Sequence, residues 1–116
     1  MRKQSTRDIG NKLEKLTVSY LEDIDSKTKQ SNNSGAVSNN SDILNKYFFT
    51  ECKQRNVKNI TVSQKIWRKL NNQIPVGSLK IPLLVLGNID NEVFAVLNMK
   101  DFHRLIKELY LTKEKG

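Results

Sequence analysis

A β-hairpin is predicted by the segment Asp42-Ile43-Leu44-Asn45-Lys46-Tyr47-Phe48-Phe49-Thr50-Glu51-Cys52-Lys53. Asn45 and Lys46 would form its turn, and the aromatic residues of the second half favour a strand. Alternate side chains of a strand point to the same face, so Glu51 and Lys53 lie side by side, with Cβ atoms about 7 Å apart. Asp42 falls on the neighbouring strand, and we expect its carboxylate to meet that of Glu51.

Two carboxylates in one small site repel each other unless a cation shares them. A hard divalent ion such as Mg²⁺ accepts carboxylate oxygens and keeps positions for water and phosphate. The ion lowers the pKa of a bound water and stabilises charge on phosphorus, and Lys53 would position that water or neutralise the charge. The hairpin therefore predicts hydrolysis of phosphodiester bonds.

Simpler interpretations of the same residues remain open. Asp42 follows Asn39-Asn40-Ser41 and would also suit a turn, while Glu51 and Lys53 would also suit a solvated pair on an edge strand. Apolar residues bracket the strand, which favours a central position, where unpaired charges are costly. This context favours a functional role for the pair.

Hydrophobic periodicity predicts three helices and two more strands. The helices span Ser5–Ile24, Ser63–Gln73 and Met99–Thr112, and the strands span Ile81–Leu86 and Glu92–Leu97. The first strand is almost entirely apolar, as in a strand buried on both faces. The order of helices and strands indicates an α/β or α+β sandwich with a mixed sheet, in a single domain spanning 1–116.

Two of these helices carry apolar stripes that are expected to face the core. The stripes are Ile9, Leu13, Leu16, Tyr20 and Ile24 in the first helix, and Phe102, Leu105, Ile106, Leu109 and Tyr110 in the last.

The segment 26–41 lacks periodicity and is rich in Ser, Asn and Gly, so it is predicted to be a loop, with room for a short strand. It is longer than most connections, which favours a flexible substrate-binding loop over a disordered linker. In this loop, Lys29, Ser34 and Gly35 are candidates for binding the backbone of a nucleic acid.

The charge distribution points to a polyanionic partner. The 116 residues include 20 Lys and Arg against 12 Asp and Glu, a formal net charge of +8. No acid lies between Cys52 and Ile89, whereas seven cations do. This asymmetry predicts one cationic face, as a DNA-binding protein needs. The cations of this stretch are Lys53, Arg55, Lys58, Lys65, Arg68, Lys69 and Lys80.

A single cysteine excludes an intramolecular disulfide and favours a reducing compartment. No apolar run approaches the roughly 20 residues that span a bilayer, and the N-terminus lacks the apolar region of a signal peptide. We therefore expect a cytoplasmic protein, from a bacterial cell or a phage-infected host, without a membrane partner. Zinc chemistry is disfavoured, because Cys52 and His103 are the only soft ligands.

The spacing of Asp42 and Glu51-Cys52-Lys53 resembles the signature of the PD-(D/E)XK nucleases, with Ser41 in place of the proline. Glu14 resembles the acidic residue on the first helix of these enzymes. The segments 10–14, 34–36 and 80–86, with Asp101-Phe102, are similar to Holliday junction resolvases of phages and archaea. The resemblance covers most of the chain.

This resemblance implies a restriction-endonuclease-like fold, with a central mixed sheet flanked by helices. It also implies a homodimer that cuts four-way or otherwise branched DNA with Mg²⁺, for which Mn²⁺ would substitute. Glu14, Asp42 and Glu51 would hold the metal with the backbone carbonyl of Cys52, and Lys53 would assist catalysis. Either Gln64 or Lys65 is expected to reach the site from the start of the second helix.

Other residues carry weaker predictions. Arg55, Lys65, Arg68 and Lys69 are candidate DNA contacts, although the three on the helix would also suit a solvated face. Glu14 neighbours Lys12 and Lys15 and would also suit a surface salt bridge. Cys52 is expected to point to the core as an inert hydrophobe, His103 to the surface, and Trp67 to the core or a dimer interface.

Two alternatives stay open for the function. One is another nuclease of the same fold, restriction-like or repair-like, which cuts linear or flapped DNA as well as a junction. The other is a basic DNA-binding module without catalysis, in which the acidic residues are structural.

Overall fold

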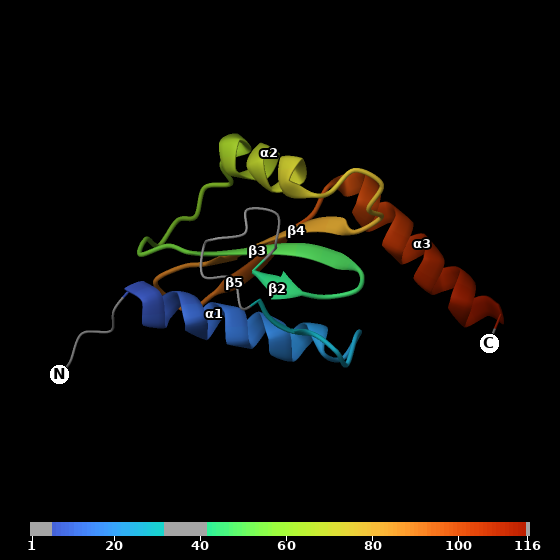
Figure 1. Cartoon of the computed structure of the whole chain (residues 1–116), viewed down its shortest axis with the longest axis horizontal. Helices are drawn as coiled ribbons and strands as arrows, with labels where there is room; N and C mark the ends of the chain where they lie inside the picture. Colours follow the sequence, from blue (N-terminus) through green and yellow to red (C-terminus); the bar gives the residue numbers. More distant parts are fainter. Residues whose placement is uncertain (1–5, 32–41, 116) are drawn as a thin grey trace.

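The structure is a computed structural model that describes residues 6–31 and 42–115, with side chains for 11–31 and 42–113. The order along the chain is α1 (Thr6–Leu21), β1 (Lys29–Gln30), β2 (Ile43–Leu44), β3 (Phe48–Gln54), α2 (Gln64–Gln73), β4 (Ile81–Gly87), β5 (Val93–Val96) and α3 (Met99–Lys115) (Figure 1). The predicted order of helices and strands is confirmed, and β1 is the short strand for which the loop 26–41 left room.

The five strands form one mixed sheet in the order β1-β2-β3-β4-β5. β3 pairs with β4 in parallel, and the other neighbours are antiparallel. All residues of β4 are buried, as expected of a strand covered on both faces. The fold is therefore α/β with a mixed sheet, and the strand that carries Glu51 and Lys53 lies at its centre.

Helices cover the two faces of the sheet and create two hydrophobic cores. α1 and α2 lie on opposite sides of the sheet (Figure 1). On the α1 side, Leu13 and Leu21 pack with Ile43, Phe48 and apolar residues of β4. On the α2 side, Leu70 packs with Phe49, Leu84 and Leu86, and Trp67 is half-buried against this cluster. Trp67 therefore belongs to the core.

The apolar stripe predicted for α1 is only partly buried. The helix buries Leu13, Thr17 and Leu21, which follow each other at intervals of four residues. Leu16, Tyr20 and Ile24 are exposed, contrary to the prediction. α1 ends at Leu21, so Ile24 lies beyond the helix, and Leu16 and Tyr20 lie on its flank.

α2 starts one residue later than predicted, because Ser63 is its N-cap and not its first helical residue. The Ser63 hydroxyl accepts a hydrogen bond from the Ile66 N–H at 3.3 Å. The helix ends at Gln73, with Ile74 in an extended C-cap conformation just before Pro75.

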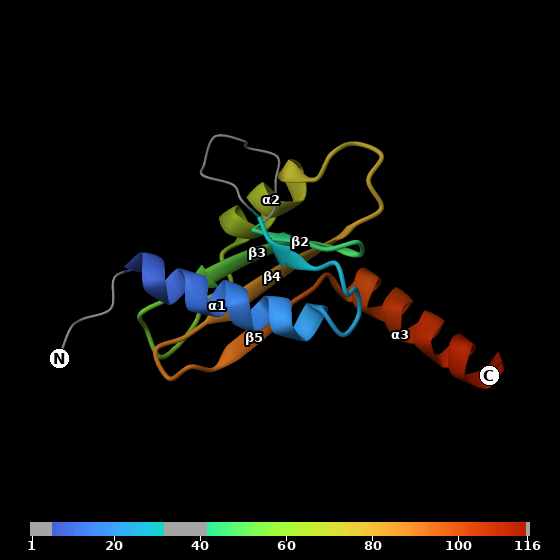
Figure 2. The same ribbon diagram turned by 60° about the horizontal axis from the view of Figure 1, so that its bottom comes forward.

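α3 also exposes much of its predicted inner face. Leu105 and Ile106 are half-buried, whereas Phe102, Leu109 and Tyr110 are exposed, which corrects the prediction. Figures 1 and 2 show the reason, because the helix runs away from the sheet and its far end has no neighbouring element to cover it. No helix in the described part of the chain is long and apolar enough to cross a membrane.

The turn of the β2–β3 hairpin is built around the buried side chain of Asn45. Its carbonyl oxygen accepts hydrogen bonds from the N–H groups of Tyr47 (2.8 Å) and Phe48 (3.1 Å). Its amide group donates to the Thr28 hydroxyl at 2.9 Å. Asn45 thus ties the hairpin that carries Asp42 and Glu51 to the segment that follows α1.

Asn45→Ala is expected to lower the free energy of unfolding by about 2–4 kcal/mol, because three hydrogen bonds are lost and the buried N–H of Phe48 loses its acceptor. Urea unfolding followed by circular dichroism measures this change. Asn59→Ala, at an exposed loop position, is the control and should change stability by less than about 0.5 kcal/mol. Equal effects of the two substitutions would contradict the structural role of Asn45.

Candidate active site

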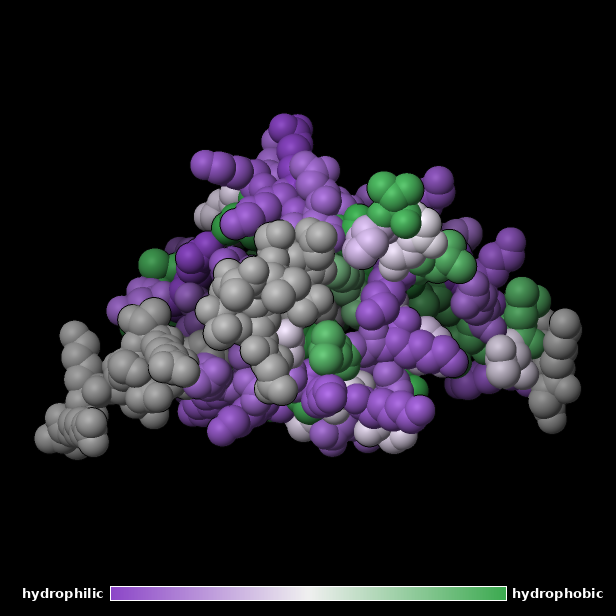
Figure 3. All heavy atoms as spheres, viewed as in Figure 1, coloured by the Kyte–Doolittle hydropathy of each residue, from purple (hydrophilic) through white to green (hydrophobic). Residues whose placement is uncertain are grey.

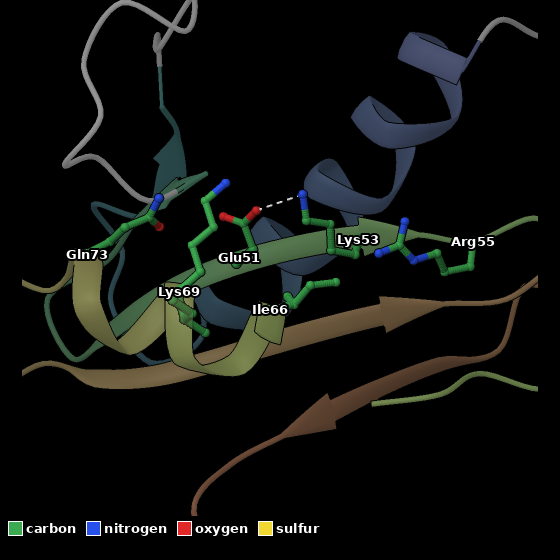
Figure 4. Close-up of a pocket in the computed structure, with 7 residues that line it drawn as sticks. Glu51, Lys53, Arg55, Ile66, Lys69 and Gln73 are labelled. Carbon is green, nitrogen blue, oxygen red and sulfur yellow. Dashed lines mark ion pairs between the residues drawn. The ribbon is translucent and has the colours of Figure 1, made fainter. Parts of the chain in front are cut away.

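Glu51 and Lys53 form an ion pair on the α2 side of the central strand. Lys53 Nζ lies 3.1 Å from Glu51 Oε1 (Figure 4). Both follow the alternation of β3, in which Phe49 packs under α2 while Phe48 and Cys52 pack toward α1. The side chains remain partly accessible, at 21% for Glu51 and 37% for Lys53. The predicted pair therefore faces solvent from the centre of the sheet.

Asp42 lies across the hairpin from Glu51. Asp42 lies in the bend just before β2, and its N–H donates to the carbonyl of Thr50, the residue that pairs with Ile43, at 3.0 Å. The Cys52 N–H donates to Asp42 Oδ2 at 2.9 Å and fixes the carboxylate beside β3.

The pKa of Asp42 is raised to about 6, mainly because burial disfavours its charged form. Repulsion from Glu51 and from Glu14 raises this pKa further, whereas the hydrogen bond from Cys52 and the charge of Lys53 lower it. The three predicted carboxylates are therefore close enough to repel each other. Asp42 forms no ion pair with any described residue, so a bound cation would relieve this repulsion.

Glu14 approaches the site from α1 and is held by a residue that the sequence did not single out. Gln30 Nε2 donates to Glu14 Oε2 at 2.9 Å. Gln30 pairs with Ile43 on β2, which places it next to Asp42. Its role depends on the register of a two-residue strand, for which the sequence carries no periodic signal.

Cys52 behaves as a hydrophobe and not as a reactive thiol. Its side chain is partly buried against the α1 core, with Sγ 3.7 Å from the Thr17 hydroxyl. Burial raises the pKa of the thiol to about 12, so it stays neutral at physiological pH. The prediction of an inert, core-facing cysteine is confirmed, and nothing in the structure tests its carbonyl as a metal ligand.

Among the side chains of 11–31 and 42–113, no three His, Cys, Asp or Glu groups lie close enough to hold one metal ion. The carboxylates of Glu14, Asp42 and Glu51, which were predicted as ligands, are thus neighbours but do not form a preformed metal site. Asp42 and Glu51 are the pair whose chemistry fits Mg²⁺, because both supply carboxylate oxygens and Asp42 lacks a counter-charge. Glu14 is engaged by Gln30 at the edge of this pair.

One face of α2, from Ile66 to Gln73, lines the site, whereas the first two residues of the helix do not. Lys69 and Gln73 line a small pocket with Glu51 and Lys53, and Arg55 closes its far end (Figure 4). Neither Gln64 nor Lys65 lines this pocket, contrary to the expectation for the start of the helix. The sequence did not predict Gln73 as a site residue, because its place over the sheet depends on how α2 crosses β3.

The other candidates lie farther from the carboxylates or outside the described residues. Lys65 and Arg68 are exposed on α2, and Lys29 is exposed on β1. Ser34 and Gly35 fall in 32–41, outside the described part of the chain. His103 is exposed on α3, as predicted.

Fold and site together define an α/β domain with a carboxylate–lysine site on its central strand, flanked by a cationic helix. No protein family, curated protein or solved structure matches this chain.

Proposed function

We propose that the protein is a Mg²⁺-dependent DNA endonuclease that prefers branched DNA, as a Holliday junction resolvase does. The observation that carries the proposal is the arrangement of Asp42, Glu51 and Lys53, in which a half-buried Asp42 carboxylate is held at the backbone of β3, the strand that carries the Glu51–Lys53 ion pair. Asp42 and Glu51 would hold the ion, which supplies Lewis acidity and lowers the pKa of a coordinated water.

Each protein group has a distinct part in the proposed reaction. The Cys52 N–H keeps the Asp42 carboxylate oriented, and Glu51 on β3 would help to hold the cation. Lys53 neutralises negative charge that develops on the phosphate as the attacking oxygen approaches. Glu14, oriented by Gln30, adds negative potential that favours a cation at Asp42.

Support for a DNA substrate comes from the charge around the site. The acid-free stretch from Cys52 to Ile89 supplies the end of β3, all of α2 and all of β4. Lys65, Arg68 and Lys69 are exposed on α2, on the same side of the sheet as Glu51 and Lys53. Phosphate contacts of this kind position a duplex without reading its sequence.

The test compares a labelled four-way junction with a matched linear duplex, in Mg²⁺ and in EDTA. Paired symmetric nicks in the junction alone, absent in EDTA, are the expected result. Equal cutting of both substrates would keep the nuclease and reject junction selectivity. Binding without cleavage in Mg²⁺ or Mn²⁺ would reject catalysis and leave a DNA-binding module.

We also propose that the protein is a homodimer, because two symmetric nicks need two active sites related by a twofold axis. The exposed apolar side chains of α3 support it as the contact. Leu109 is 54% exposed and Tyr110 is 63% exposed. Figure 3 shows hydrophobic surface near α3 and the segment after α2, whereas the rest of this face is mostly hydrophilic. Isolated apolar patches of this kind mark interaction sites.

Leu109→Ser with Tyr110→Ser is expected to convert the dimer into a monomer, since each buried large side chain contributes about 1.5–3 kcal/mol. Light scattering coupled to size exclusion measures the mass. The same variant should nick one strand of a junction without coupling to the second. Val62→Ser, at another exposed apolar residue, is the control and should leave the dimer intact. A wild-type protein that is monomeric at tens of micromolar would contradict the proposal.

A further inference from the structure

A small cavity of about 80 Å³ lies between β3 and α2, beside the Glu51–Lys53 ion pair. Figure 4 shows the Glu51 carboxylate between the side chains of Lys53 and Lys69, with Gln73 beyond Lys69 and Arg55 beyond Lys53. The walls also include Ile66 and Leu70, which pack into the α2 core. The cavity is thus lined by polar side chains around its mouth and by the apolar side chains of Ile66 and Leu70 at its base.

The charges of this cavity are not balanced. Three cations line it against one carboxylate, and that carboxylate is paired with Lys53. Within the described residues, the side chains of Arg55, Lys69 and Gln73 form no ion pair or hydrogen bond. Lys69 and Gln73 lie at one end of the cavity and Arg55 lies at the other (Figure 4). A free cation and a free amide are thus neighbours on α2, which suits an anion with several acceptor oxygens.

These three residues are held by regular structure. Lys69 and Gln73 are four residues apart on α2 and share one face of the helix. Leu70, which is 1% exposed, anchors that helix to the sheet between them. On the other side, the Arg55 N–H donates to the Gly87 carbonyl at 2.9 Å and continues the pairing of β3 with β4. The backbones of these residues are therefore fixed relative to β3, while their side chains remain free to turn toward a ligand.

The lining of the cavity favours a compact anion. Cations and an amide surround a small space that opens to solvent, which suits a phosphate group. A nucleic acid strand would therefore present its backbone here.

We infer that Lys69 and Gln73 bind one backbone phosphate of DNA, adjacent to the bond that Asp42 and Glu51 are proposed to cleave. The inference rests on the proposed function for the identity of the polyanion. Lys69 supplies charge, and the Gln73 amide donates a hydrogen bond to a phosphate oxygen. α2 thereby sets the position of the duplex relative to the carboxylates.

The test measures DNA binding by fluorescence anisotropy over a range of NaCl concentrations. EDTA is present, so that the proposed metal-dependent cleavage does not occur. Lys69→Ala should weaken binding about five- to tenfold at 0.1 M salt, and the slope of log K against log salt should fall by about 0.9. Lys15→Ala removes the same charge from an exposed position on α1, across the sheet, and should change neither value appreciably. Equal slopes for the two variants would overturn the inference.

Gln73→Leu separates a specific contact from general attraction, because it removes a donor without changing charge. It should weaken binding about two- to fivefold with an unchanged salt slope. Lys69→Arg, which keeps the charge, should retain the slope of the wild type. No effect of Gln73→Leu would exclude that residue from the subsite, and the inference as stated would be wrong.

The two proposals fail in different ways. A wild type that binds DNA through Lys69 but never cleaves it would reject the nuclease and keep the phosphate subsite. A Lys69→Ala variant that binds and cleaves like the wild type would reject the subsite and keep the nuclease. Binding of inorganic phosphate at millimolar concentration that is lost in Lys69→Ala, while the same substitution leaves duplex binding unchanged, would identify a site for free phosphate and overturn the assignment to DNA.

Discussion

Glu51→Gln is expected to reduce Mg²⁺-dependent cleavage of a four-way junction by at least about 10³-fold, equivalent to about 4 kcal/mol of transition-state stabilisation. The substitution keeps the size of the side chain and removes the charge that would share the cation with Asp42. It also removes the ion pair with Lys53, but a partly exposed pair of this kind contributes little to stability. The fold should therefore persist.

Single-turnover cleavage with excess enzyme measures this rate, and anisotropy in EDTA measures DNA affinity in parallel. Affinity should be equal to or slightly above that of the wild type, because one negative charge near the DNA is lost. Glu22→Gln makes the same chemical change at an exposed position after α1 and serves as the control. A Glu51→Gln variant that cleaves at the wild-type rate would remove Glu51 from the active site.

Asp42→Asn is expected to stabilise the metal-free protein while abolishing cleavage. The pKa of Asp42 is about 6 in the folded protein against an ordinary value of 3.8, so the folded state holds this proton more tightly than the unfolded state. Stability therefore falls as pH rises from about 4 to about 6, and the loss is complete above that range. Asparagine is never ionised and avoids the loss.

The shift in the pKa of Asp42 sets the expected gain in the free energy of unfolding for Asp42→Asn. Two pKa units correspond to at most about 3 kcal/mol, and solvent contact reduces the expected gain to about 1–2 kcal/mol at pH 7.5. The asparagine side chain that replaces Asp42 also retains an oxygen that accepts the Cys52 N–H, so this donor keeps its partner. Urea unfolding in EDTA at pH 4 and pH 7.5 measures the difference, which should be near zero at the lower pH.

Mg²⁺ should reverse this ranking. At a hundred times the dissociation constant, the ion would stabilise the wild type by about 2.7 kcal/mol, more than the gain of Asp42→Asn, and would stabilise Asp42→Asn by almost nothing. Protons compete with the ion for Asp42, so apparent Mg²⁺ affinity should weaken about tenfold per pH unit below 6. Asp90→Asn, in the exposed turn between β4 and β5, is the control. If Mg²⁺ does not change the free energy of unfolding of the wild type, the assignment of Asp42 as a ligand is contradicted.

The central part of the architecture follows from the order of residues alone. Alternation along 48–53 placed Glu51 and Lys53 on one face and Cys52 on the other, because side chains of a strand alternate regardless of context. The apolar run of β4 required cover on both faces, and helical periodicity located α1, α2 and α3. These features depend on residues close together in the chain, and local geometry suffices to predict them.

Long-range packing, in contrast, sets which parts of the helices are covered and which residues join the site. Leu16, Tyr20, Leu109 and Tyr110 fit apolar stripes, yet no described element packs on them, because burial depends on neighbours distant in sequence. Gln30 reached Glu14 through the register of β1, and Gln73 reached the cavity through the crossing of α2 over β3. Register and packing are long-range properties that residue spacing does not contain, and they brought these two amides to the carboxylates.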